Sequence, residues 1–169
     1  MKLYFVRHAT ASRKTTWSDE DDLRPLTRSG RRRFRASASS LVASGALAPQ
    51  RIVTSPLVRA AQTAAMLGKL LGGAAPIAED WRLGHAFSLA DLTAILAENR
   101  SARSLAIVGH NPSMCEVLGE FVGTADLDLR KGAIACVEVA DPRGGHGRLM
   151  WLVPPALIVS CDNAPESRP

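Results

Sequence analysis

The chain has 169 residues, 46% of them hydrophobic and 22% charged, which is the range of ordinary globular domains and excludes a disordered or collagen-like protein. This length predicts one domain, and no apolar run approaches the roughly 20 residues that a membrane-spanning helix needs. The 21 Lys and Arg residues outweigh the 16 Asp and Glu residues, and the excess lies in the first 70 residues, which indicates an anionic substrate or partner.

Strand-like and helix-like segments alternate along the chain, and this order predicts an α/β fold. Continuous apolar runs, typical of strands buried on both faces, occur at residues 3–6, 52–53 and 105–108. Helical patterns run over residues 27 to about 44, 57 to about 71, 89–98 and 112–121, and late strands over 133–139 and 149–153. Thr27 can cap the first helix, and Gly72-Gly73 ends the second.

We expect one domain over residues 1–161, with a turn at 142–145 between the late strands and a frayed polar tail at 162–169. The three cysteines, at positions 115, 136 and 161, are odd in number and lack CxxC spacing, which predicts free buried thiols. Arg7 interrupts the opening apolar run before a signal-peptide core forms, so we expect a cytoplasmic protein.

The sequence contains two runs of charged residues, the acidic residues 19–22 and the basic residues 31–33. Most charge runs are solvated faces, and that is the first expectation for both. An arginine stripe at helical spacing comprises Arg28, Arg31, Arg32 and Arg35. Such a stripe also suits the docking of an acidic partner, which is the second reading.

Polar groups follow each of the three apolar strands, at the edge where open parallel sheets bind ligands. These groups are Arg7-His8, then Ser55-Pro56 with Arg59, and finally Gly109-His110-Asn111-Pro112. Each segment alone is weak evidence for a site. Two histidines and two arginines at one edge are hard to explain by packing, because buried cations repel one another unless an anion lies between them.

A phosphoryl group fits this set of side chains. Arg7 and Arg59 offer forked donors for its oxygens, and the helices that begin near Leu57 and Pro112 add their N-terminal dipoles. A histidine with an ordinary pKa of about 6.5 keeps a neutral nitrogen that can attack phosphorus at cellular pH. The chain has no GxxxxGK[ST], GxGxxG, GxSxG or HExxH motif, and no cysteine is followed six residues later by arginine.

Four ordered motifs carry a resemblance to a known family. They are Val6-Arg7-His8-Ala9, Arg24-Pro25-Leu26-Thr27-Arg28-Ser29-Gly30, Ser55-Pro56-Leu57-Val58-Arg59-Ala60-Ala61-Gln62-Thr63 and Val108-Gly109-His110-Asn111-Pro112. With these motifs, residues 2 to about 152 resemble the histidine phosphatase (phosphoglycerate mutase-like) superfamily. The second motif is the most discriminating, and it resembles the short phosphohistidine phosphatases of the SixA type.

The resemblance implies a three-layer α/β sandwich, with helices flanking a mostly parallel central sheet and without a large lid insertion. It implies that His8 is the nucleophile and forms a phosphohistidine intermediate. It also implies that Arg7, Arg59 and His110 hold the phosphoryl oxygens, and that no metal or other cofactor takes part.

The general acid is where this chain departs from the family. Mutase-type relatives carry a glutamate on a long insertion, whereas only 46 residues separate Thr63 from His110 here. Arg82 stands about where a family carboxylate would be. The candidates for an acid or for substrate binding are Asp22, Arg24, Glu79, Asp80 and His85.

Three hypotheses about function remain open. The first is a phosphatase for phosphohistidine on a protein such as a histidine phosphotransfer domain, because an imidazole leaving group can be protonated before the P–N bond breaks. A short rim without a lid would admit such a protein, whose acidic surface would meet the stripe at Arg28, Arg31 and Arg35. The second is a small-molecule phosphomonoesterase, and the third is a phosphate-binding module without activity, which would not need the nucleophile His8.

The remaining expectations concern partners. Aromatic residues make up only 5% of the chain and do not alternate with basic ones, so we expect no specific nucleic-acid binding. We also expect no membrane partner and a monomeric protein.

Overall fold

The computed structural model describes residues 1–18, 20–141 and 145–155. Its strands are β1 (Lys2–Arg7), β2 (Arg51–Thr54), β3 (Ile77–Glu79), β4 (Ser104–Gly109), β5 (Ile134–Glu138) and β6 (Arg148–Val153). Its helices are α1 (Arg28–Ala43), α2 (Val58–Leu70), α3 (Leu89–Glu98) and α4 (Ser113–Val122), with 3-10 turns η1 (Lys14–Thr16), η2 (Asp21–Leu23) and η3 (Trp81–Leu83). Cys161, the predicted tail at 162–169 and most of the predicted turn at 142–145 lie outside the described residues.

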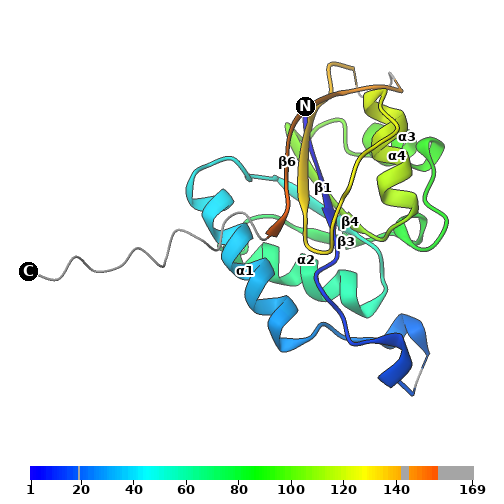
Figure 1. Cartoon of the computed structure of the whole chain (residues 1–169). Coiled ribbons are helices and arrows are strands. Elements are labelled where there is room, and N and C mark those ends of the chain that lie inside the picture. Colours follow the sequence, from blue (N-terminus) through cyan, green and yellow to red (C-terminus); the bar gives the residue numbers. More distant parts are fainter. Residues whose placement is uncertain (19, 142–144, 156–169) are drawn as a thin grey trace, which may run out of the picture.

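The strands form one sheet in the order β3-β2-β4-β1-β5-β6 (Figure 1). The first four are mutually parallel, while β5 and β6 run antiparallel to their neighbours. Helices α1 and α2 cover one face of the sheet, and α3 and α4 cover the other. The predicted three-layer α/β fold is therefore confirmed. Residues 71–103, where a lid insertion would lie, hold only β3, η3 and α3.

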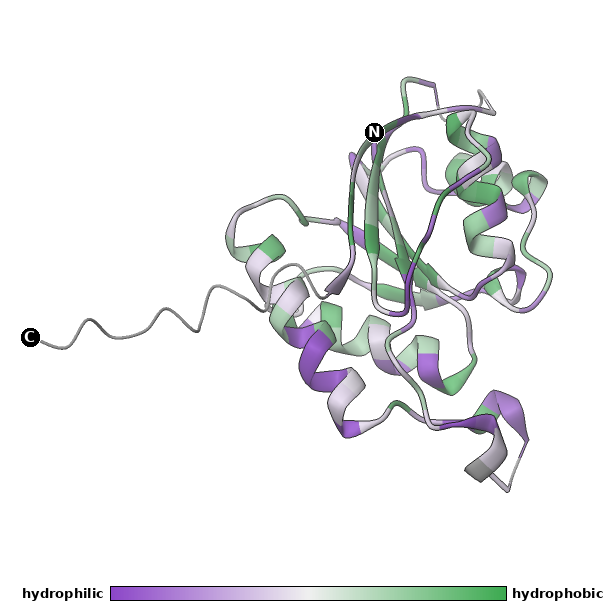
Figure 2. Cartoon of the chain, in the orientation of Figure 1, coloured by the Kyte–Doolittle hydropathy of each residue, from purple (hydrophilic) through white to green (hydrophobic). Residues whose placement is uncertain are grey.

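Strand β1 shows why these residues form a buried central strand. Leu3 and Phe5 pack into the hydrophobic cluster under α3 and α4, and Tyr4 and Val6 pack into the cluster under α1 and α2. A strand covered on both faces needs apolar residues at every position, which is the continuous run seen in the sequence. Figure 2 shows this contrast, with apolar strands inside and a hydrophilic outer face on α1.

The predicted helix signals operate as expected. The Thr27 hydroxyl oxygen accepts the backbone N–H of Gly30 at 2.9 Å and caps α1. After α2, Gly72 and Gly73 adopt φ angles of 70° and 76°, which favour glycine and end the helix. Strand β3 was not predicted, because its three residues are all exposed and pair only at the sheet edge with β2.

Two further observations concern the described part of the chain. Cys136 is a buried free thiol, as predicted, while Cys115 is free but only half-buried. None of the helices in residues 1–18, 20–141 and 145–155 is long and apolar enough to cross a membrane.

Candidate active site

The carboxyl ends of β1, β2 and β4 place the predicted site residues together. Strand β4 lies between β1 and β2, and backbone hydrogen bonds continue past the strands from His8 N–H to Gly109 O (3.0 Å) and from Ser55 N–H to Val108 O (2.9 Å). The imidazole rings of His8 and His110 consequently lie with their centroids 5.0 Å apart. We refer to His8, His110, Arg7 and Arg59 as the cradle.

His8 is positioned as a neutral nucleophile. Its Nδ1 lies 2.7 Å from the carbonyl oxygen of Ala9, which can only accept, so Nδ1 carries the proton and Nε2 keeps its lone pair. Burial is the main reason why the pKa of His8 is lowered to about 4. The hydrogen bond to Ala9 opposes this shift, and the charges of Arg59, Arg7 and Lys131 add to it. The ring is therefore neutral, and able to attack, near pH 7.

His110 is held by the motif that precedes α2. Its Nε2 lies 2.9 Å from Ser55 Oγ, which already accepts the Leu57 N–H at 3.2 Å. This arrangement favours donation by the serine hydroxyl to Nε2 and a proton on His110 Nδ1. Burial, and to a smaller extent the charges of His8, Arg59, His85 and Arg7, lower the pKa of His110 to about 2.

The two guanidinium groups are anchored but not fully satisfied. Arg7 donates through one terminal nitrogen to Leu129 O at 2.9 Å, and Arg59 donates to Asp21 O at 2.8 Å. Burial lowers the pKa of both arginines. Within the cradle, Arg7 Nε, Arg59 Nε and His110 Nδ1 are buried without a hydrogen-bond partner, and outside it Arg24 Nε is a fourth such nitrogen of the described residues. Buried donors are nearly always paired, so the three unpartnered nitrogens of the cradle fit the oxygens of a bound anion.

Other residues of the motifs hold the cradle in place. Thr63 accepts the Ala9 N–H at 3.1 Å and donates to Arg59 O at 2.7 Å, which ties the segment after β1 to α2. The Gln62 side-chain oxygen accepts from Leu26 N–H and from the Arg31 guanidinium, both at 2.9 Å. These two residues position the site rather than contribute to its chemistry.

The reading of residues 19–22 as a solvated face is wrong for Asp21, whereas Asp22 is about half exposed and contacts an exposed partner. Asp21 forms ion pairs with Arg24 (3.0 Å) and Arg59 (3.2 Å), and Asp22 lies 2.9 Å from the His85 ring. The loop is brought there because Arg24 donates to Ser12 O at 2.7 Å and Ser12 N–H donates to Pro25 O. The available signal was an acidic run directly before an arginine of a site motif.

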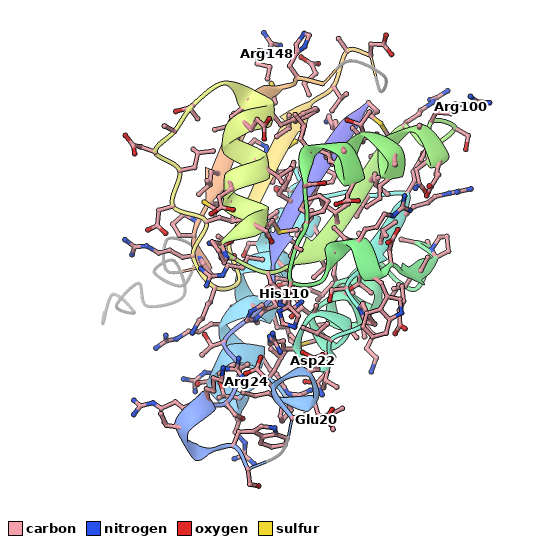
Figure 3. The ribbon with its side chains drawn as sticks, turned by 90° about the vertical axis from the view of Figure 1, so that its right-hand side faces the viewer. Glu20, Asp22, Arg24, Arg100, His110 and Arg148 are labelled. Atoms are coloured by element: carbon pink, nitrogen blue, oxygen red, sulfur yellow. The ribbon has the colours of Figure 1, made fainter. Side chains whose placement is uncertain are left out.

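The candidate acids separate into two groups. His85 lies beside the cradle, its ring stacked at a centroid distance of 6.2 Å from that of His110, and it is joined to Asp22. Figure 3 shows Asp22 and Arg24 on the loop below His110. Asp80 instead binds Arg82 at 2.6 Å, which lowers the pKa of that carboxyl, and Glu79 is exposed on β3. Neither forms a described hydrogen bond or ion pair with the cradle.

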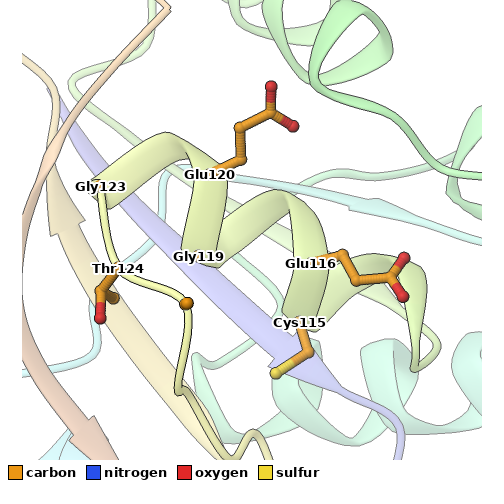
Figure 4. A pocket seen from close by; sticks show the side chains of 7 residues that line it. Cys115, Glu116, Gly119, Glu120, Gly123 and Thr124 are labelled. Atoms are coloured by element: carbon orange, nitrogen blue, oxygen red, sulfur yellow. The ribbon is translucent and has the colours of Figure 1, made fainter.

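A hollow along α4 is lined by no residue of the cradle (Figure 4). Glu116 and Glu120 are among its lining residues, and their carboxylates would repel a phosphoryl group. No cluster of His, Cys, Asp and Glu able to hold a metal ion occurs among the described residues.

Comparison with known proteins gives consistent matches. The model of the histidine phosphatase superfamily (branch 1) matches residues 3–85. An uncharacterized protein of Picosynechococcus sp. (strain ATCC 27264 / PCC 7002 / PR-6) is 36% identical over 118 residues, which cover 69% of this chain and 70% of that protein.

Solved structures share the fold. The protein histidine phosphatase SixA complexed with tungstate superposes with a TM-score of 0.82 at 24% identity, over 93% of this chain and 99% of that one. The α-ribazole phosphatase from Shigella flexneri superposes with a TM-score of 0.74 at 15% identity, over 92% of this chain and 97% of that one. The same sheet and helices therefore occur in phosphatases named for different substrates.

Proposed function

Because this chain belongs to the histidine phosphatase superfamily, we propose that it is a phosphatase that hydrolyses phosphohistidine on a protein, through a phosphorylated intermediate at His8. The observation that carries the proposal is the set of three buried, unpartnered nitrogens on Arg7, Arg59 and His110. Tungstate, which the related SixA structure binds, has the tetrahedral shape and negative charge of a phosphoryl group.

The reaction proceeds in two transfers. His8 Nε2 attacks phosphorus, a new P–N bond forms to the enzyme, and the P–N bond to the substrate histidine breaks as that imidazole leaves with a proton. A water molecule then attacks phosphorus, the bond to His8 breaks, and inorganic phosphate is released with the neutral His8 ring restored. The Nδ1–H bond to Ala9 O keeps His8 in the attacking tautomer throughout.

The cradle stabilises the charge that the phosphoryl oxygens carry in both transfers. Preorganised donors in a buried site act more strongly than in water, and removing one typically costs about 10² to 10³ in rate. The positive charges of Arg7 and Arg59 act on both histidine rings, so these groups lie within electrostatic reach of a phosphoryl group bound between the rings.

The leaving group favours a phosphoramidate over an ester. An alkoxide needs a proton in the transition state, whereas a phosphohistidine imidazole can take up its proton before the bond breaks. Asp80 is held by Arg82, and Glu79 is exposed on an edge strand, so neither carboxyl is placed to donate that proton.

Hydrolysis of phosphoimidazole, compared with an alkyl phosphate, tests this proposal. We expect kcat/KM to be at least about tenfold higher for phosphoimidazole, since only the ester depends on a general acid. We also expect His8→Ala to abolish both activities and the acid-labile label trapped from ³²P substrate. Faster ester hydrolysis by the native protein, or an active His8→Ala variant, would overturn the proposal.

A second candidate function, a small-molecule phosphomonoesterase, rests on the Asp22–His85 pair. His85 is the one candidate acid stacked against His110, and its Nε2 is 2.9 Å from Asp22. Under this alternative, His85→Gln lowers kcat for the alkyl phosphate by at least about tenfold and leaves phosphoimidazole hydrolysis near native. An equal effect on both substrates would remove His85 as an acid.

A further inference from the structure

A large cavity adjoins the cradle. It has a volume of about 1170 Å³ and lies between the first half of α1, the segment after β1 and the loop that precedes β5. Arg7 belongs both to the cradle and to the wall of this cavity, and Ala9, which directly follows His8, lines it too. Arg7 thus links the cavity to the cradle, whereas His8, His110 and Arg59 do not line it.

The floor of the cavity is apolar and close-packed. Gly132, at φ 79°, packs between Phe34, Ala9 and Pro155, where an added Cβ would lie 3.1 Å from the proline ring. Its N–H donates to the carbonyl oxygens of both Arg7 and His8, at 3.2 and 3.0 Å. The floor is thereby part of the backbone framework that holds the nucleophile.

The rim of the cavity is cationic. Besides Arg7, it carries Arg32 and Arg33 from α1 and Arg130 and Lys131 from the loop, and no carboxylate lines it. Arg130 is paired with Asp128 at 2.7 Å. In the described residues, no ion pair includes Arg32, Arg33 or Lys131. Arg32 and Arg33 are also exposed. These three charges are available to a ligand.

The positive charge of the rim also acts on the nucleophile, His8. Lys131 is among the groups whose positive charge acts on His8 and lowers its pKa, together with Arg59 and Arg7. The positive charge of Lys131 therefore acts both on an anionic group bound at the rim and on a phosphoryl group bound in the cradle. A ligand that complements both the apolar floor and the cationic rim has an apolar part and carboxylate groups.

We propose that this cavity is a docking site for an acidic segment of the phosphoprotein substrate. The carboxylate side chains of that segment lie near the phosphohistidine, either in the substrate's sequence or in its folded structure. The inference rests on the proposed function, because it takes the phosphohistidine to belong to a protein. It places docking at Arg32, Arg33 and Lys131, whereas the sequence pattern favoured Arg28, Arg31 and Arg35. Of the four arginines of the stripe, only Arg32 lines this cavity. In the structure Arg31 and Arg35 line a separate groove with Gln62.

The test uses two chemically phosphorylated phosphohistidine peptides that differ only in flanking residues, one carrying glutamates and the other glutamines. We expect the native protein to favour the glutamate peptide by about tenfold in kcat/KM at low salt, as exposed charge pairs allow. Arg32→Glu combined with Arg33→Glu should abolish or reverse this preference. Arg100→Glu combined with Arg103→Glu makes the same change in net charge and should preserve the preference. Arg100 lies far from His110 in Figure 3, and Arg103 precedes β4 whereas His110 follows the other end of that strand.

Three outcomes would overturn the docking site. They are equal turnover of the two peptides by the native protein, a preference that survives the Arg32/Arg33 change, and a preference lost instead in Arg28→Glu with Arg35→Glu. Fluorescence anisotropy with the unphosphorylated peptides gives the same comparison without catalysis. A protein that binds the acidic peptide through Arg32 and Arg33 but hydrolyses no phosphoimidazole would support the docking site and refute the proposed function.

Discussion

The carboxylate of Asp21 reaches the guanidinium of Arg59, with Oδ2 3.2 Å from a terminal nitrogen, and the backbone oxygen of Asp21 accepts from the same group. Arg59 is only 4% exposed and the Asp21 side chain 28%, so this contact is partly shielded from water. Asp21 therefore neutralises part of the charge that a phosphoryl group would use. The acidic residue competes with the substrate for the cradle while it holds Arg59 in position.

Replacing Asp21 with Asn removes this competition. We expect Asp21→Asn to bind inorganic phosphate about threefold to tenfold more tightly, because the carbonyl contact to Arg59 remains while the negative charge is lost. The inhibition constant of phosphate against phosphoimidazole hydrolysis measures the change. Glu98→Gln, which removes a carboxylate bound to Arg82 instead, is the matched control and should leave the constant unchanged. Weaker phosphate binding in Asp21→Asn would refute the competition.

The lowered pKa values of the two histidines make folding stability depend on pH. Both rings have a pKa near 6.5 in the unfolded chain, but about 4 and about 2 in the folded one, so the unfolded state binds more protons below pH 6.5. Stability contributed by neutral burial is present above pH 6.5. It is lost as pH falls toward 4, by up to about 1.4 kcal/mol per histidine per pH unit.

Urea unfolding at pH 7.0 and 5.0 measures this loss. The His8→Asn variant should lose less stability across the interval than the native protein, by about one proton's contribution. Saturating phosphate should also reduce the loss of stability, since a bound anion favours a protonated ring beside it. Parallel curves for native protein and variant would show that His8 does not titrate in this range.

Thr63 ties two segments of the site together through one fully buried hydroxyl. Thr63→Val leaves the buried Ala9 N–H without its partner, so we expect a loss of about 1 to 3 kcal/mol in the free energy of unfolding. We also expect kcat to fall while phosphate still binds, because His8 is displaced rather than removed. Ser40→Ala, at an exposed hydroxyl on α1 that bonds within its own helix, should change neither quantity.

Gly30 in the second motif is required by close approach rather than by its own backbone angle. A Cβ at this position would lie 2.2 Å from the carbonyl oxygen of Thr10, which is itself held by Thr27. Gly30→Ala should therefore destabilise the protein by about 2 to 4 kcal/mol, as a backbone shift is needed. Thermal unfolding measures the effect. Gly145→Ala, where a Cβ meets nothing within 4 Å, is the control, and equal melting temperatures would contradict the expectation.

Much of the fold was readable because its signals are local. Apolar runs marked β1 and β4, Thr27 marked the start of α1, and glycines marked the end of α2. The exposed edge strand β3 has no such pattern, because its position depends on pairing with β2 alone. Sequence order likewise placed the two histidines at one edge of the sheet.

The rest of the site depends on contacts between distant segments. Asp21 lies 38 residues from Arg59, and Asp22 lies 63 residues from His85. Contacts between residues so far apart produce no local pattern in the sequence. The same holds for the cavity, which separates Arg32 and Arg33 from Arg31 and Arg35 although all four lie on one helix. Which arginines of α1 line the cavity depends on how α1 packs against the loop at 130–132.

The backbone around His8 is secured from three sides, by Gly109 on its N–H, by Gly132 on its carbonyl oxygen and by Thr63 on the next residue. Each anchor belongs to a different part of the fold. A change in substrate range can thus arise in the surrounding loops while the attacking nitrogen stays where it is. The residues that anchor His8 are thus distinct from the surrounding loops, which can change. This separation makes the fold a good starting point for laboratory evolution of new phosphatases.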